Sequence, residues 1–277
     1  MRVFLTGATG YIGSAVLCEL KNAGHQVVGL ARSDDSAAKL KEVGVDSHRG
    51  DIDDLDSLRR GAATADGVIH LAFNHDFSNF DGALTADLHA VEAMGSALEG
   101  SGKPFVITTH NNGLAAEKVM VSLAESGVRT SIVELCPSVH GEGDTGFVPR
   151  LIQIAKTKGF SAYVEEGTNR WPAVHRLDAA HLYRLALENA PAGSRLNGVA
   201  DEGIPFRDIA QVIGQQLNLP VVSISREEAN DHFGFLGTLA ALDIPKSSTS
   251  TQELLNWKPL QLGLIADLEQ QGSYFNN

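Results

Sequence analysis

The feature that most constrains the fold of this chain is a run of closely spaced glycines near its amino end. The segment TGATGYIG places Gly7, Gly10 and Gly13 between an apolar, β-branched run at residues 2–6 and a segment with helical apolar spacing. Glycine permits a tight turn and a close approach of backbone to phosphate, and the first N–H groups of a helix attract anions. The flanking strand and helix therefore favour a dinucleotide site over a purely structural turn.

The alternation of apolar runs with helical segments predicts a parallel α/β fold. Helical spacing ends first at Gly24 and recurs near residues 84–99 and 114–126. Strands that alternate with helices form a parallel sheet covered on both faces through right-handed crossovers. We therefore expect a Rossmann-type, doubly wound α/β sheet. Its buried strands are expected at residues 2–6, 26–31, 66–73, 103–109 and 130–136.

The pattern changes after about residue 145, where helical segments are separated by short strands such as GSRLNGVA and PVVSI. No linker rich in proline, glycine or serine divides the chain at this point. We expect a dinucleotide-binding Rossmann core over residues 1–145 and a smaller, mainly C-terminal substrate-binding lobe over residues 146–277. The lobe is expected to pack on the core and to share a cleft with it.

Composition restricts the classes of partner. The net charge is −12 and the 22 lysines and arginines form no run, so the sequence predicts no nucleic-acid partner. No apolar stretch reaches the length of a membrane span, and the chain begins in a structured motif rather than a signal peptide. We therefore expect a cytoplasmic protein with no membrane partner. Cys18 and Cys136 lack a second ligand at metal-binding spacing, so packed thiols and no metal site are expected.

Several motifs, in the same order, make the chain resemble the extended and atypical short-chain dehydrogenase/reductases, which include the NAD-dependent epimerase/dehydratase group. The motifs are TGATGYIGSAV, GDIDD at 50–54, VIHLAF at 68–73, PSVHGEGD at 137–144 and VHRLDAAHLYRLALE at 174–188. Together they cover most of the chain. The resemblance implies an NAD(P)-binding oxidoreductase that acts on a small carbonyl or alcohol substrate. Because family members commonly dimerise, it also suggests a homodimer.

The end of the second strand bears on the choice of cofactor. A carboxylate there suits the ribose hydroxyls of NAD, whereas an arginine suits the 2′-phosphate of NADP. The sequence GLARSDD puts Arg32 and Ser33 before Asp34, so NADP(H) is favoured over NAD(H); Arg32 as an ordinary surface charge is the alternative. The residues themselves predict a cofactor site that comprises Gly7, Thr9, Gly10, Tyr11, Ile12, Gly13, Arg32 and Ser33. The resemblance adds Asp51 and Ile52 at the adenine, Leu71, Ala72 and Phe73 further along, and Pro137, Ser138, Val139 and His140 beside the nicotinamide.

The catalytic group of the family is the part that this sequence lacks. Typical members use a Ser or Thr at the end of the fifth strand, a Tyr, and a Lys four residues later that lowers the pKa of the phenol. Here no tyrosine is followed by Lys at that spacing. The tyrosines are Tyr11, Tyr163, Tyr183 and Tyr274.

The connection between the fifth strand and its helix is also shorter than relatives usually have. Aligning Glu117 with a glutamate common in the family helix puts Thr109 in the tyrosine position. The short segment at residues 110–114 is either a real shortening or a mis-spliced gene model, and the sequence leaves both open. His110 is a candidate proton donor because imidazole titrates near neutral pH, and Thr108 or Thr109 could hold a carbonyl oxygen. A structural loop histidine is the alternative.

Three functions remain open. An NADP(H)-dependent oxidoreductase explains why the second half is retained, since that half could form a substrate cleft. A non-catalytic NADP(H)-binding sensor, like the family's NmrA-type members, explains the missing catalytic pair. An isomerase or lyase with the nucleotide as scaffold shares the same motif. We favour the oxidoreductase, partly by analogy of fold. Its candidate substrate contacts are Phe147, Arg170, Trp171 and His175.

Overall fold

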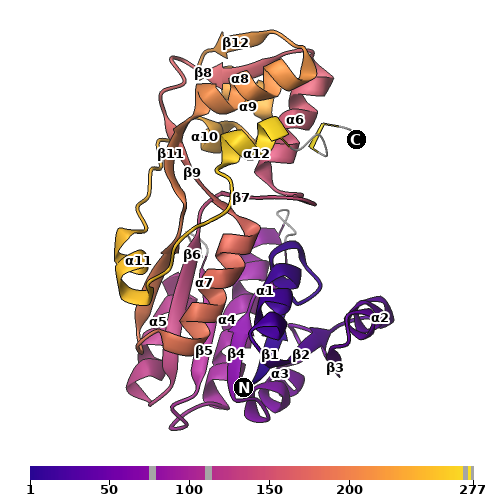
Figure 1. Cartoon of the computed structure of the whole chain (residues 1–277), viewed down its shortest axis with the longest axis vertical. Helices are drawn as coiled ribbons and strands as arrows, with labels where there is room; N and C mark the ends of the chain where they lie inside the picture. The colour runs from indigo at the N-terminus through magenta and orange to yellow at the C-terminus, as the bar shows by residue number, and fades with distance from the viewer. Residues whose placement is uncertain (75–78, 110–113, 271–273, 276–277) are drawn as a thin grey trace. The chain divides into compact units, whose positions relative to one another are not determined.

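The computed structural model describes residues 1–74, 79–109, 114–270 and 274–275 (Figure 1). Contacts between residues group the chain into two compact units, and neither unit is one continuous stretch. The expected division after residue 145 stays a prediction. The first unit comprises Met1–Glu134, Ala180–Leu196 and Ser250–Trp257, and the second comprises Leu135–Ala179, Asn197–Thr249 and Lys258–Asn277.

The first unit is built on a seven-stranded sheet with the strand order β10-β6-β5-β4-β1-β2-β3. Among the strands from β3 to β6, every neighbouring pair is parallel. The order 3-2-1-4-5-6 is that of a doubly wound dinucleotide-binding sheet, so the predicted Rossmann-type α/β fold is confirmed. The strands are β1 (Arg2–Thr6), β2 (Gln26–Ala31), β3 (Asp46–Arg49), β4 (Gly67–His70), β5 (Pro104–Thr109), β6 (Arg129–Leu135) and β10 (Ser194–Gly198).

Helices between these strands bury their apolar faces against the sheet. One buried cluster joins Phe4 of β1, Leu58 of α3, Met94 of α4, Phe105 of β5 and Met120 of α5. Fully burying a side chain of this size contributes roughly 1.5–3 kcal/mol, so the cluster fixes these helices on the sheet. The helices are α1 (Tyr11–Asn22), α2 (Asp34–Glu42), α3 (Leu55–Ala63), α4 (Phe80–Ser96), α5 (Leu114–Glu125), α7 (Arg176–Asn189) and α11 (Thr249–Leu255).

The second unit has two small sheets and its own core. A three-stranded sheet has the order β11-β9-β7, and β12 pairs with β8 in parallel. Trp171 and Phe206 are fully buried and pack edge to face, with ring centroids 4.9 Å apart. The elements are β7 (Ser138–His140), α6 (Phe147–Lys158), β8 (Ser161–Val164), β9 (Arg170–His175), β11 (Asp201–Pro205), α8 (Phe206–Leu217), β12 (Val221–Ile224), α9 (Ala229–Phe233), η2 (Gly234–Leu236), α10 (Gly237–Ala240) and α12 (Leu264–Gln270).

Two expectations about single residues and strands need correction. Cys18 is exposed, because it lies on the face of α1 opposite its buried residues, whereas Cys136 is buried as expected. The strand β10, which the sequence assigns to the lobe, is an edge strand of the seven-stranded sheet. Within the described ranges, no helix is long and apolar enough to cross a membrane. Those same ranges contain no group of three His, Cys, Asp or Glu side chains placed to hold a metal ion.

Candidate functional site

The turn between β1 and α1 is closed by backbone on two sides. Gly7 has a φ of 69°, and a Cβ atom there would lie 2.7 Å from the carbonyl carbon of Leu71 and 2.8 Å from the amide nitrogen of Ala72. A Cβ atom on Gly13 would collide with the carbonyl oxygen of Gly7. The amide of Gly10 donates a 2.9 Å hydrogen bond to that same oxygen. This geometry requires glycine at positions 7 and 13.

The amino end of α1 suits an anion. The helix begins after Gly10 with no side-chain cap in the described part of the structure and with no acidic residue in its first turn. By contrast, Ser33 caps α2 and Asp54 caps α3, and both of those helices carry acidic residues in their first turns. The first amides of α1 therefore present partial positive charge without a competing carboxylate. Together with the exposed Thr9 and Gly10, this turn fits the diphosphate of a dinucleotide.

A buried network that the sequence did not reveal supports this turn. The hydroxyl of Thr6 accepts hydrogen bonds of 3.1 Å from the amides of Leu71 and Ala72 and lies 2.6 Å from Nδ1 of His70. Because both lone pairs of the hydroxyl are used, its proton goes to Nδ1, and His70 carries its own proton on Nε2. Nε2 lies 3.3 Å from Asp87 Oδ1, without hydrogen-bond geometry. The network holds residues 71–72 against Gly7.

The predicted adenosine side consists of residues that follow β2 and β3. Arg32 is exposed, and no hydrogen bond or ion pair joins it to another residue of the described ranges. The hydroxyl of Ser33 is engaged in capping α2, where it accepts from the amide of Ser36 at 3.2 Å. Asp51 and Ile52 are partly buried beyond β3. Arg32 is therefore the side chain of this group best able to bind an added phosphate.

The residues beyond β4 are partly buried, which leaves them some accessible surface. Leu71 and Ala72 have this intermediate burial, as does Phe73. The ring of Phe73 packs edge to face on Phe80, with the centroids 6.1 Å apart. These positions agree with a role in lining a cofactor, which stays a prediction.

The two candidate catalytic hydroxyls at the end of β5 already have partners in the first unit. Thr108 Oγ1 lies 2.5 Å from the hydroxyl of Tyr183, and burial raises the pKa of that phenol. Thr109 Oγ1 donates to Glu117 Oε1 at 2.8 Å, and Arg195 forms a 2.8 Å ion pair with Glu117. His110 lies outside the described residues, so its predicted role as proton donor stays a prediction.

The predicted nicotinamide segment at residues 137–140 lies near the start of the second unit, which begins at Leu135. Pro137 and Val139 are partly buried, whereas Ser138 and His140 are buried. His140 Nδ1 lies 2.7 Å from Asp267 Oδ2, and neither side chain has exposed surface. His140 as a whole has no exposed surface, and its predicted cofactor contact stays a prediction. Asp267 follows His140 by 127 residues, so no spacing rule could have paired them.

Other titratable groups surround this pair. The hydroxyl of Tyr274 accepts from the amide of Gly141 at 2.7 Å and donates to the carbonyl oxygen of Gly141 at 3.0 Å. Burial raises the pKa of Asp144 to about 6. Burial also lowers the pKa of His175, whose ring centroid is 5.3 Å from that of His140. His175 is therefore neutral at pH 7.

The four candidate substrate residues differ in accessibility. Trp171 is fully buried and its indole N–H donates to the carbonyl oxygen of Leu239 at 3.1 Å, and His175 is also buried. Phe147 is partly buried against Trp171. Arg170 is exposed, forms a two-point ion pair with Asp243, and lines an open surface groove of about 340 Å³. Within the second unit, Phe147 and Arg170 therefore keep surface for a ligand.

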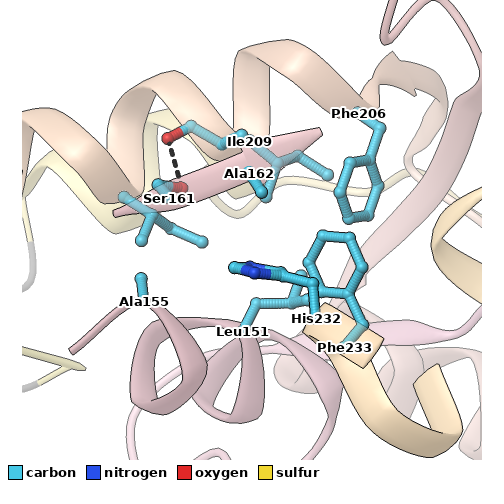
Figure 2. Close-up of a pocket in the computed structure, with 10 residues that line it drawn as sticks. Leu151, Ala155, Ser161, Ala162, Phe206, Ile209, His232 and Phe233 are labelled. Carbon is cyan, nitrogen blue, oxygen red and sulfur yellow. Dashed lines mark hydrogen bonds between the residues drawn. The ribbon is translucent and has the colours of Figure 1, made fainter. Parts of the chain in front are cut away.

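An enclosed cavity of the second unit lies in its apolar core, between α6, β8, α8 and α9 (Figure 2). The ring of His232 points into it among Leu151, Ile209 and Phe233, and Ser161 is hydrogen-bonded to the carbonyl oxygen of Ala210 at one side. The cavity volume is about 10 Å³. That is roughly the space of one water molecule, so this cavity is too small to be a substrate site.

The chain is similar to several known proteins. A family model described as the NAD dependent epimerase/dehydratase family matches residues 3–97. An uncharacterized protein of Schizosaccharomyces pombe is 46% identical, over 99% of this chain and 100% of its own length. Their alignment spans 296 positions, more than the 277 residues of this chain, so the relative contains internal residues that this chain lacks.

Two further similarities concern proteins of described activity. A 2-alkyl-3-oxoalkanoate reductase of Stenotrophomonas maltophilia is 25% identical, over 80% of this chain and 77% of its own length. The crystal structure of a dTDP-glucose 4,6-dehydratase from Streptomyces venezuelae, determined with NAD bound, superposes with a TM-score of 0.78. That similarity covers 99% of this chain and 97% of the dehydratase at 15% identity, so it concerns the fold.

Proposed function

Because the chain belongs to the NAD dependent epimerase/dehydratase family, we propose that it is an NADP(H)-dependent oxidoreductase that reduces a small ketone. The observation that carries the proposal is the turn between β1 and α1. Its shape requires glycine at positions 7 and 13, and it leads into a helix whose amino end has no side-chain cap among the described residues. Such a turn fits the diphosphate of a dinucleotide.

The choice of NADP(H) over NAD(H) is supported by Arg32. Its exposed guanidinium has no partner among the described residues and directly follows β2. A guanidinium binds a phosphate dianion through charge-assisted hydrogen bonds. The carboxylate that would suit NAD at this place comes later, at Asp34, in the first turn of α2.

Within the first unit, Thr108 is the better placed of the two threonines to hold a carbonyl oxygen. Thr109 gives its single hydroxyl proton to Glu117, so it can only accept further hydrogen bonds. If Tyr183 donates to Thr108, the hydroxyl of Thr108 keeps its own proton for a substrate oxygen. The bound nicotinamide would supply the hydride, and we assign the proton to His110.

The class of substrate is supported by the reductase relative, whose name describes the reduction of a 3-oxo acid. The test measures NADPH consumption with a panel that includes a 2-alkyl-3-oxoalkanoate, simple ketones, aldehydes and quinones. We expect turnover with a ketone. We expect His110→Ala to lower its rate by roughly 10² to 10⁴ while NADPH binding is retained. His89→Ala, which changes an exposed histidine of α4, is the matched control and should match the wild type.

The main alternative is a non-catalytic NADP(H) sensor. It is favoured by the absence of a Tyr-x-x-x-Lys pair in the sequence and by the hydroxyl of Thr109, which is engaged with Glu117. NADPH binding without turnover of any ketone, aldehyde or quinone would support the sensor. If calorimetry detects neither NADPH nor NADH binding to the folded protein, both functions are wrong.

A further inference from the structure

Three charged residues, Arg32, Asp34 and Arg49, lie at or just after the carboxyl ends of β2 and β3. Ala31 and Arg49 are register partners on these parallel strands, and the amide of Gly50 donates to the carbonyl oxygen of Ala31 at 3.3 Å. Arg32 follows Ala31 directly, so the backbone of Arg32 lies at the same edge of the sheet as Arg49. Asp34 opens α2 two residues later.

Arg49 points to the side of the sheet on which Asp34 lies. Successive residues of a strand face opposite sides, and the preceding residue, His48, contacts Phe4 and the hydroxyl of Ser57 on the α3 side. Arg49 Nη1 lies 3.3 Å from Asp34 Oδ1. No sequence motif marks Arg49; only the strand register brings it level with Ala31, the last residue of β2.

The pair between Arg49 and Asp34 is easily exchanged for another partner. The Arg49 side chain is 54% exposed and that of Asp34 is fully exposed. Exposed ion pairs of this kind contribute little to stability because water and salt screen them. A phosphate dianion carries more charge than one carboxylate and accepts several hydrogen bonds, so it would compete well for the guanidinium.

We propose that Arg49 and Asp34 together determine the discrimination between NADP(H) and NAD(H). This inference rests on the proposed function, since it concerns the same cofactor site. Arg49 joins Arg32 in binding the 2′-phosphate. It also neutralises Asp34, whose carboxylate would otherwise repel that phosphate and accept hydrogen bonds from the ribose hydroxyls of NAD(H). The acid that follows the second strand is thus counteracted by an arginine from the third.

The test measures NADPH and NADH binding by calorimetry on the full chain. Arg49→Gln removes the charge and keeps a polar side chain, and we expect it to weaken NADPH binding about tenfold, in line with the loss of a charge-assisted contact. NADH binding should change less than about twofold, because NADH has no 2′-phosphate. Asp34→Asn should strengthen NADPH binding. Arg59→Gln is the matched control: it removes the same charge from an exposed pair with Asp56 on α3 and should change neither affinity.

The outcomes separate this inference from the proposed function. If the wild type prefers NADPH and Arg49→Gln keeps that preference, the role of Arg49 is wrong while the proposed function stands. Equal weakening of NADPH and NADH by Arg49→Gln also overturns the inference, because it would indicate a general effect on the fold. If the wild type binds neither nucleotide, the proposed function fails together with the inference. Thermal unfolding of each variant shows that the compared proteins are folded.

Discussion

Asp144, in the loop between β7 and α6, makes stability depend on pH. Burial raises its pKa from 3.8 to about 6, so between these values the folded protein holds a proton that the unfolded chain releases. The stabilisation that protonated Asp144 gives to the folded state is therefore fully present below pH 3.8 and is lost as the pH rises through about 6. Above that pH, the fold carries a partly buried carboxylate at a cost in free energy.

We expect Asp144→Asn to stabilise the protein above pH 6 and to have little effect below pH 3.8. The shift corresponds to at most about 3 kcal/mol, which partial solvent access reduces to roughly 1–2 kcal/mol. Asparagine keeps an oxygen for the 2.6 Å hydrogen bond from the amide of Gly146. Denaturant unfolding at the two pH values measures the effect, with Glu142→Gln, an exposed neighbour, as control. An equal gain at both pH values would contradict this assignment.

At the level of single residues, the sequence predicts what depends on neighbours in the chain. Gly13 could be identified because its clash lies within one turn, and Gly7 because the turn needs its positive φ, although the backbone of Leu71 that packs on Gly7 left no local signal. Arg32 could be identified because it directly follows a strand. Exposure is harder to predict: Trp171 and His175, which were expected to contact substrate, are buried in the second unit, and that role stays a prediction. Partners far along the chain, such as Asp267 for His140, leave no local signal.

At the level of elements, the turn between β1 and α1 separates two roles of glycine. A Cβ atom on Gly13 would collide with the carbonyl oxygen of Gly7, whereas one on Gly10 would come no closer than 3.2 Å to that atom. We expect Gly13→Ala to destabilise the protein without ligand by roughly 1–3 kcal/mol, as overpacking does. Gly10→Ala should leave that stability nearly unchanged but weaken NADPH binding, because the added methyl occupies the path of the diphosphate.

Thermal unfolding without ligand and calorimetric titration with NADPH measure these two effects separately. The proposed division of roles would be wrong if Gly10→Ala bound NADPH as tightly as the wild type. It would also be wrong if Gly13→Ala unfolded at the temperature of the wild type. Each variant therefore serves as the control for the other.

The elements found by sequence were those with an apolar pattern. The strands β1, β2, β5 and β6 match the predicted runs within a residue or two, whereas β3 was missed because its sequence, DSHR, is polar and mostly exposed. The predicted strand at 66–73 ends at His70, since the amides of Leu71 and Ala72 bond to Thr6 instead of continuing the ladder. The alignment with the Schizosaccharomyces pombe relative is longer than this chain, which agrees with a shortened connection somewhere along the chain. That the shortening lies after β5 stays a prediction.

At the level of the whole molecule, neither of the two compact units is a continuous stretch of the chain. The chain passes between the two units five times, so each unit contains segments that are bounded in sequence by the other. If the second unit unfolded alone, Ala180–Leu196 and Ser250–Trp257 would have to stay folded between long flexible loops. Closing such loops costs entropy, which favours unfolding of both units together.

We therefore expect a single cooperative thermal transition that shifts as a whole when NADPH binds. At a concentration 100 times its dissociation constant, a ligand of the folded state adds about 2.7 kcal/mol, which corresponds to roughly 5 °C for a chain of this size. Scanning calorimetry with and without NADPH measures the shift, and nicotinamide alone, which lacks the diphosphate, is the control ligand. Two transitions, of which NADPH moves only one, would show that the units unfold independently despite the repeated crossings of the chain.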